Sequence, residues 1–254
     1  MRSYAIGDIH GQLEKLRVAH AFIAEDMARH GLAPVVHVGD LVDRGPDSRG
    51  VIDFLIAGQA AGQPWVVLKG NHDRMFTGFL ATENHHDPRL IATLSWLHPR
   101  LGGGATLASY GVINAADRPI APVYAEAVAA VPVAHRDWLD ALPVLHRMGD
   151  VVFVHAGVRP GVPLDQQIED DLVWIREPFL SDTSDHGALI VHGHTVVEAP
   201  THYGNRLNID VGAGYGGPVT AVAIDGLDVF HLTATGRVPL LPVQALPMAR
   251  RHPT

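Results

Sequence analysis

The 254-residue sequence contains no cysteine. Disulfide bonds, thiolate zinc sites and cysteine nucleophiles are therefore excluded from its structure and chemistry. Long apolar runs are also missing, because no apolar stretch reaches the roughly 18 residues that a membrane-spanning helix needs. The first residues, MRSYAIGD, lack the basic start and the apolar core of a signal peptide. We therefore expect a cytoplasmic protein without a membrane partner.

An excess of positive charge is absent as well. The chain has 19 lysines and arginines against 27 acidic residues, with a net charge of −8. No basic cluster offers a track for a phosphate backbone, so nucleic acid is not an expected partner. Histidine is abundant, with 17 residues. Together with the carboxylates, these imidazoles supply the nitrogen and oxygen ligands that manganese, iron and zinc prefer.

Short apolar runs alternate with helical patterns over residues 3–82. Each run is followed by a stretch with apolar residues on one helical face, which predicts a βαβαβα series, a largely parallel sheet and helices on its faces. Residues 82–148 are less regular and are expected to form a partly helical insertion, with helices at about 123–130 and 135–141. Two further strands are predicted at 150–157 and 187–195, and an antiparallel meander at 205–232.

Polar clusters follow five of these apolar runs. In open α/β sheets, ligands bind beyond the carboxyl ends of the strands, so the clusters are expected to meet at one edge. One cluster ends the run VVHVGDLVDRGPD at residues 35–47, where two carboxylates and an arginine stand close together. The clusters contain Asp8 and His10; Asp40, Asp43 and Arg44; Asn71, His72 and Asp73; His155; and His192 and His194.

Each histidine taken alone is most simply a hydrogen-bonded structural residue. Several carboxylates and imidazoles gathered in one place would instead repel or remain unsatisfied unless a cation joined them. A mixture of Asp, His and Asn suits manganese, iron or zinc better than calcium, which prefers oxygen ligands only. The sequence therefore predicts a divalent metal site.

The five clusters resemble the motif series of the phosphoprotein phosphatase family of metallophosphoesterases, in particular its bacterial serine/threonine branch. The motifs GDxHG, GDxVDRG, GNHE, HAG and a late histidine stand here, in the family's order, at residues 7–11, 39–45, 70–73, 155–157 and 193–195. The resemblance implies the α/β metallophosphoesterase fold, a β-sandwich of two mixed sheets flanked by helices in four layers. It also implies a single domain over residues 1–254, with the insertion at 82–148.

The resemblance further implies a metal site of six ligands. Asp40 would bridge two divalent ions, most simply manganese, with iron and zinc as alternatives, and a hydroxide between the ions would attack phosphorus directly. The first ion would be held by Asp8 and His10, and the second by Asn71, His155 and His194.

Other residues are expected to bind phosphate and to move a proton. Arg44 would bind two phosphoryl oxygens, with a surface ion pair to Asp43 or Asp47 as the alternative. His72, paired with Asp43, would act as general acid, with a purely structural role as the alternative. Arg176 and Asn71 are further candidates for phosphate contact.

Two departures from the family pattern stand out. Asp73 occupies the place of the family's glutamate and is one methylene shorter. Val196 follows the sequence HGHT, where other metallophosphoesterases carry one more histidine, and this favours the phosphoprotein phosphatase pattern. His192 could substitute for that ligand but is read as a structural residue at a strand end.

The expected activity is therefore the metal-dependent hydrolysis of phosphoserine and phosphothreonine in proteins, with phosphotyrosine as a further substrate. A symmetrical dinucleoside tetraphosphate hydrolase is the first alternative, because it shares similar motifs. A non-catalytic metal-binding protein is the second. Trp96, Trp174 and Tyr215 are expected either to wall a substrate groove or to pack in the core.

Overall fold

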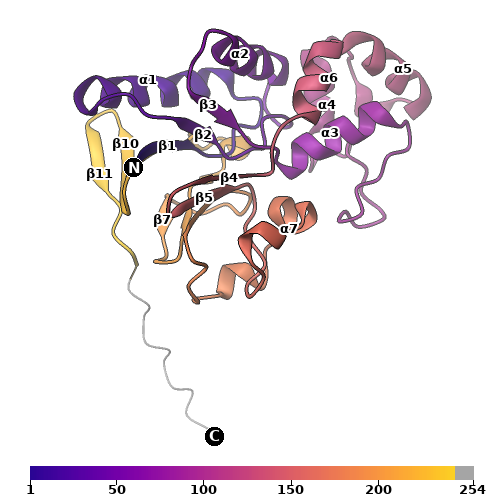
Figure 1. Ribbon diagram of the computed structural model, residues 1–254. Coiled ribbons are helices and arrows are strands. Elements are labelled where there is room, and N and C mark those ends of the chain that lie inside the picture. Colours follow the sequence, from indigo (N-terminus) through magenta and orange to yellow (C-terminus); the bar gives the residue numbers. More distant parts are fainter. Residues whose placement is uncertain (244–254) are drawn as a thin grey trace, which may run out of the picture.

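Two β-sheets pack face to face in the computed structural model, which describes residues 1–243, and helices cover their outer sides (Figure 1). This arrangement confirms the predicted metallophosphoesterase fold. The single-domain prediction for residues 1–254 stays a prediction, and its last residues, 244–254, lie outside the described part of the chain. Among the described residues, no helix combines the length and the apolar character needed to cross a membrane.

The first sheet has six strands in the order β11-β10-β9-β1-β2-β3. Its three N-terminal strands pair in parallel, whereas the other three form an antiparallel meander that joins β1. The sheet is thus mixed, as predicted: the strands of the βαβαβα series are parallel, and β9 and β10 are antiparallel. The strands are β1 (Arg2–Ile6), β2 (Val35–His37), β3 (Trp65–Val67), β9 (Ala221–Asp225), β10 (Asp228–Thr233) and β11 (Gly236–Pro239).

The second sheet has five strands in the order β4-β5-β6-β8-β7. Its members are β4 (Leu145–Met148), β5 (Val151–Val154), β6 (Leu189–His192), β7 (Thr201–His202) and β8 (Arg206–Asn208). β8 pairs in parallel with β6, so the meander predicted over 205–232 is divided between the two sheets. Both parts read as strands, but an apolar run does not encode which sheet it will join.

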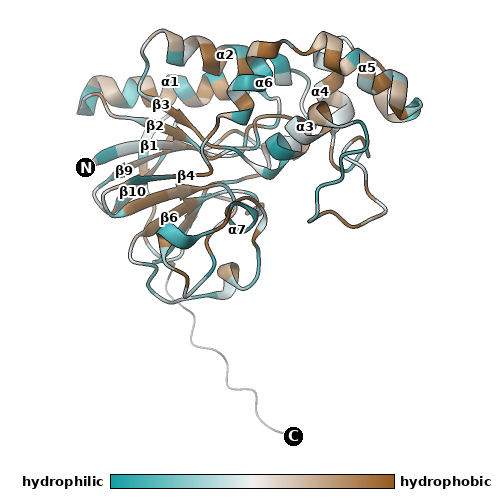
Figure 2. Cartoon of the chain, turned by 45° about the vertical axis from the view of Figure 1, so that its right-hand side comes forward, coloured by the Kyte–Doolittle hydropathy of each residue, from teal (hydrophilic) through white to brown (hydrophobic). Residues whose placement is uncertain are grey.

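Apolar side chains of the two sheets fill the space between them. Ala5 and Val36 from the first sheet, and Leu68 directly after β3, meet Phe153 and Val191 from the second sheet, and all five are fully buried. Figure 2 shows the strands largely in the hydrophobic colour, whereas the outer helices carry both colours. This packing fixes the two sheets relative to each other and so places the strand ends that carry the polar clusters.

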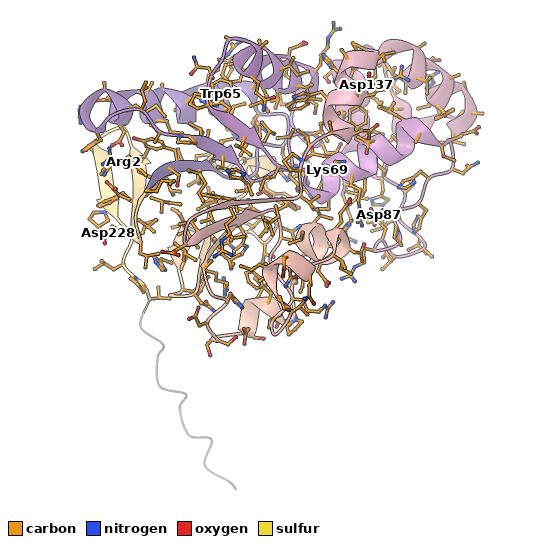
Figure 3. The ribbon with its side chains drawn as sticks, in the orientation of Figure 1. Arg2, Trp65, Lys69, Asp87, Asp137 and Asp228 are labelled. Carbon is orange, nitrogen blue, oxygen red and sulfur yellow. The ribbon has the colours of Figure 1, made fainter. Side chains whose placement is uncertain are left out.

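Helices α1 (Leu13–His30) and α2 (Ser48–Ala60) lie on the outer face of the first sheet (Figure 1). α2 begins where the Asp47 side chain accepts a hydrogen bond from the amide of Gly50. Trp65 is the first residue of β3 and packs its ring against α2 (Figure 3), where a Cβ at Gly58 would meet the ring at 1.8 Å. A glycine is therefore required where the helix crosses this tryptophan.

Residues 71–140 form four further helices, α3 (Asn71–Ala81), α4 (Gly103–Ser109), α5 (Ile120–Ala130) and α6 (Val133–Asp140). The last two match the helices predicted inside the insertion. α4 was not predicted, because three consecutive glycines are unfavourable in a helix. These glycines make room for neighbouring groups, since a Cβ at Gly103 would lie 2.5 Å from the Trp96 ring. The remaining helices are α7 (Glu169–Trp174) and the short 3-10 helices η1 (Ala115–Asp117), η2 (Leu164–Gln166), η3 (Phe179–Ser181) and η4 (Ala213–Tyr215).

Candidate active site

The polar clusters after β1, β2, β3, β5 and β6 meet at one edge of the sandwich, around a cavity of about 300 Å³. Eight of the predicted site residues line the cavity directly: Asp8, His10, Asp40, Arg44, Asn71, His72, Arg176 and His194. The other two, Asp43 and His155, are completely buried behind them. The structure thus brings together all ten residues that the sequence predicted for metal binding, phosphate binding and catalysis.

The backbone is unusual at this edge. Of the six non-glycine residues with positive φ in the described part of the chain, five belong to the clusters: His10 (47°), Asp40 (50°), Asp43 (74°), Arg44 (67°) and His194 (65°). Such a conformation costs about 1–3 kcal/mol for each residue and persists only where the surrounding structure enforces it. The sharp turns after the strands direct these side chains into the cavity rather than along the strand.

Asp40 stands at the centre of the site. One of its oxygens, Oδ1, lies 3.3 Å from Nε2 of His155, and the other, Oδ2, lies 3.5 Å from Nε2 of His10. Burial by itself would raise the pKa of Asp40, but the surrounding imidazoles outweigh burial and lower it. Two groups of candidate metal ligands share this carboxylate, and within each group the ligand atoms lie within 4.8 Å of one another: His10, Asp40 and His72, and Asp40, His155 and His194.

Asn71, the first residue of α3, completes the second group. Its Oδ1 lies 2.9 Å from Nε2 of His155 and 2.9 Å from Nδ1 of His194. The Nε2 atom of His194 is buried and has no hydrogen-bond partner among the described residues. An amide oxygen that converges with a ring nitrogen from each of two imidazoles fits a divalent cation.

Backbone carbonyls orient two of the histidines. Nδ1 of His10 lies 2.9 Å from the carbonyl oxygen of Val42, and Nδ1 of His155 lies 3.0 Å from that of Val38. A proton on each Nδ1 donates to the carbonyl and leaves the Nε2 lone pair facing Asp40. Burial lowers the pKa of both histidines, which favours the neutral imidazole that metals bind.

Asp8 is paired with a carboxylate that the sequence reading missed, Asp210. Asp8 accepts a hydrogen bond from the amide of His194 at 3.1 Å, and both carboxylates line the cavity. Burial and the negative charges of Asp210 and Asp40 raise the pKa of Asp8 well above its usual range, and burial raises the pKa of Asp210 to about 6. A divalent cation would offset this concentration of negative charge. A weaker form of the signal was available, because Asp210 follows residues 206–209, in which apolar residues alternate with polar ones.

The predicted contact between Asp43 and His72 is present. Nδ1 of His72 lies 2.6 Å from Oδ2 of Asp43. Trp96 and Thr106 also donate hydrogen bonds to this carboxylate, at 2.8 and 2.7 Å. Trp96 is therefore a buried support of Asp43 and not a wall of the cavity, whereas Trp174 and Tyr215 both line it.

Arg44 reaches into the cavity and makes no ion pair with a carboxylate in the part of the chain that the structure describes. One terminal nitrogen of its guanidinium contacts Nε2 of His10, and the other lies 3.0 Å from Nε2 of His72. The guanidinium also lies over the ring of Tyr215, 4.7 Å from its centre. The surface ion pair considered from the sequence is thus not formed, and the donors of Arg44 are directed towards the metal-ligand groups.

Asp73 and His192 support the site from outside the cavity. Asp73 accepts hydrogen bonds from the amides of Leu41, at 2.9 Å, and Gly70, at 2.8 Å, and so connects the turns after β2 and β3. The shorter side chain still spans both turns. His192 is completely buried against Phe179 and does not line the cavity, in keeping with a structural residue at a strand end.

The rim of the cavity comes from two segments, and Arg74 contacts both of them. Arg74 on α3 contacts Asp87 with its Nε at 2.8 Å and Asp170 on α7 with a terminal nitrogen at 3.0 Å. Asp87 lies on the segment that follows α3 (Figure 3). That segment supplies Leu90, Leu94, Arg100 and Leu101 to the cavity wall, and the segment at the end of α7 supplies Trp174 and Arg176.

Known proteins resemble this chain along most of its length. It is 26% identical to an asymmetrical bis(5'-nucleosyl)-tetraphosphatase of Anoxybacillus flavithermus, over 91% of this chain and 93% of the relative. It is 28% identical to serine/threonine-protein phosphatase 1 of Salmonella typhimurium, over 87% of this chain and 91% of the relative. A symmetrical bis(5'-nucleosyl)-tetraphosphatase of Neisseria meningitidis is 30% identical, but the match covers 63% of this chain and only 45% of that relative.

Solved structures show the same fold. The crystal structure of a putative diadenosine tetraphosphatase superimposes with a TM-score of 0.63 at 22% identity, covering 94% of both chains. A cold-active protein-tyrosine phosphatase of a psychrophilic Shewanella species gives a TM-score of 0.62 at 18% identity, over 94% of this chain and 80% of the other. The family profile described as calcineurin-like phosphoesterase matches residues 1–223, which include all five clusters. The chain therefore belongs to the calcineurin-like phosphoesterase family of metal-dependent hydrolases.

Proposed function

We propose that this enzyme is a phosphoprotein phosphatase that hydrolyses the phosphomonoesters of serine and threonine, with phosphotyrosine as a further substrate. The observation that carries the proposal is the position of Asp40, which belongs to both groups of candidate metal ligands. A His72–Asp43 pair and the Arg44 guanidinium lie beside it at the same cavity. A site of this composition suits the transfer of a phosphoryl group to water.

Two divalent ions would be held by the side chains that converge on Asp40. Asp40 would contact both ions, and manganese is the expected metal, with iron and zinc as alternatives. The pair would supply Lewis acidity, which makes water a stronger nucleophile and neutralises charge on the phosphoryl oxygens. Asp8 and His10 would hold the first ion, and Asn71, His155 and His194 the second.

His72 belongs geometrically to the first group but is assigned here as the general acid. Its Nε2 is 4.0 Å from Asp40 and 3.0 Å from Arg44, so it faces the position where a phosphoryl group held by Arg44 would lie. The carboxylate of Asp43 accepts a hydrogen bond from the other ring nitrogen and so holds the ring with Nε2 towards the cavity. When the bond between phosphorus and the leaving oxygen breaks, that oxygen takes the proton from Nε2.

Arg44 would bind the phosphoryl group through its planar fork of donors. Arg176 and Asn71 line the same cavity and would contact the remaining phosphoryl oxygens. Since these groups are positioned before the substrate arrives, they would stabilise the charge that develops during the reaction without reorganising.

Hydrolysis of a dinucleoside tetraphosphate is the second candidate. It is favoured by the aromatic residues of the cavity, because Trp174 and Tyr215 could each stack on a base. The names of several relatives point in the same direction. A metal-binding protein without activity is the third candidate, and the complete set of ligand, acid and arginine side chains around one cavity argues against it.

The test compares substrates on one preparation of the enzyme with added manganese. We expect kcat/KM to be highest for phosphoserine and phosphothreonine peptides, lower for a phosphotyrosine peptide of the same sequence, and lowest for diadenosine tetraphosphate. Faster turnover of the dinucleotide than of every peptide would establish the second candidate. If neither the peptides nor an aryl phosphate released phosphate under any of the three metals, the proposal would be abandoned.

A further inference from the structure

A second cavity, of about 460 Å³, adjoins the candidate active site. The two cavities share three lining residues, Arg44, Arg100 and Tyr215. Tyr215 is 68% exposed, and one face of its ring is covered by the guanidinium of Arg44. A substrate bound with its phosphoryl group in the first cavity can therefore extend past these three side chains into the second.

The charged side chains that line the second cavity are all positive. It contains two arginines and no acidic residue, although the whole chain carries a net charge of −8. The remaining lining residues are apolar or glycine, and three of them, Gly102, Gly104 and Gly214, present no side chain. A bound anion would meet two guanidinium groups there without repulsion from a carboxylate.

Arg100 differs from the other arginines of the rim. Arg74 and Arg89 both pair with Asp170, at 3.0 and 3.5 Å. The exposed guanidinium of Arg100 makes no ion pair and no hydrogen bond within residues 1–243. Its backbone is held in a turn, because its amide hydrogen-bonds to the imidazole of His98 at 3.2 Å. The backbone of Arg100 is thus held in place, and its guanidinium, unpaired within the described chain, lies where the two cavities adjoin.

We propose that Arg100 is a specificity-determining residue, which selects substrates that carry a second anionic group next to the scissile phosphoryl group. This inference rests on the phosphoester hydrolysis proposed above and specifies the substrate class. Arg44 holds the phosphoryl group that is removed, and Arg100 contacts the second anion. That anion is either the carboxylate of an acidic residue beside the phosphorylated one or a further phosphate of the same molecule, because a guanidinium binds both in the same way.

The experiment uses two pairs of substrates. The first pair is a phosphoserine peptide with aspartates flanking the phosphoserine and the same peptide with alanines in their place. The second pair is diadenosine tetraphosphate and p-nitrophenyl phosphate. For each pair, the ratio of kcat/KM is measured in the parent enzyme, in Arg100→Gln and Arg100→Lys, and in Arg17→Gln, which removes an equal charge from an exposed helix position outside both cavities.

We expect the ratio for at least one pair to fall about tenfold in Arg100→Gln, to be partly restored in Arg100→Lys, and to stay unchanged in Arg17→Gln. The pair that responds identifies the source of the second anion. If Arg100→Gln lowers kcat/KM equally for both substrates of each pair, or leaves all four values unchanged, the inference is wrong. If no peptide is hydrolysed but the dinucleotide ratio still depends on Arg100, the inference holds while the protein phosphatase assignment fails.

Discussion

Nδ1 of His72 lies 2.6 Å from Oδ2 of Asp43, and this carboxylate is completely buried. Trp96 and Thr106 hold it in place through two further hydrogen bonds. The arrangement orients the imidazole so that Nε2 faces the cavity. Asp43 itself belongs to neither group of candidate metal ligands, so its role can be tested separately from metal binding.

The first prediction concerns this pair. Asp43→Asn removes the carboxylate that accepts the hydrogen bond from Nδ1 of His72 and orients its ring, so we expect kcat for a phosphoserine peptide to fall by about a hundredfold, with bound metal retained. The loss should be smaller for p-nitrophenyl phosphate, because its leaving group needs no proton. Metal analysis and steady-state kinetics check both statements.

His72→Asn is the matched variant for that prediction. If His72 is the general acid, its loss and the loss of Asp43 should not be additive in the double variant, because the two residues act as a unit. Metal loss in His72→Asn alone would contradict this assignment and make His72 a ligand.

The second prediction concerns Asp40, which belongs to both ligand groups. Asp40→Asn removes the carboxylate charge from between the two sites, so we expect loss of at least one metal per chain and a decrease in activity of more than about a hundredfold. Elemental analysis after dialysis gives the metal content. An Asp40→Asn variant with full metal and parental turnover would show that the active site lies elsewhere.

The third prediction concerns phosphate binding. Arg44→Gln should raise KM and lower kcat, with kcat/KM decreased by about ten- to a hundredfold and the metal content unchanged. Inhibition by inorganic phosphate should weaken in parallel, since the product uses the same contact. Unchanged phosphate inhibition would mean that Arg44 does not bind the phosphoryl group.

The fourth prediction concerns the rim. Arg74→Gln leaves Asp87, which is 1% exposed, without its charged partner. We expect this variant to lose about 2–3 kcal/mol of unfolding free energy, because a buried carboxylate without a partner is costly. Urea denaturation measures the loss. Arg17→Gln, which breaks an exposed pair with Glu14, should change the stability by less than about 0.5 kcal/mol.

The fifth prediction concerns an ion pair far from the site. Arg237 on β11 donates two hydrogen bonds to Asp26 on α1, at 2.8 and 2.7 Å, and Tyr4 donates a third at 2.7 Å. Burial opposes ionisation of Asp26, but these hydrogen bonds outweigh it and hold the pKa of the carboxyl below its usual range. We expect Asp26→Asn to lower the unfolding free energy by about 2 kcal/mol at pH 7.

The pH dependence of that loss follows from the direction of the shift. A carboxyl with a lower pKa in the folded chain stabilises it fully above about pH 5, and the contribution disappears as the pH falls through the folded-state pKa. The difference between the parent and Asp26→Asn should therefore shrink in acid. A difference that stayed constant down to pH 2 would mean that packing, and not ionisation, accounts for it.

Much of the site was predictable because its signals are local. A run such as Val35–Val38 reads as a strand from its own residues, and the carboxylates and histidines that follow each run are placed by chain direction alone. The helices at 120–130 and 133–140 were predicted for the same reason. Asp210 was missed because it follows an alternating stretch, residues 206–209, and not an apolar run.

By itself, the sequence determined the strand ends, the order of the five clusters and the chemistry of their side chains, because periodicity and residue type are properties of neighbouring residues. Only the tertiary structure decided that β8 joins the second sheet while β9 joins the first, that Trp96 and Thr106 hold Asp43, and that Arg100 stands between two cavities. These relationships join residues far apart in the chain. They depend on which apolar faces pack together, and no local pattern encodes that choice.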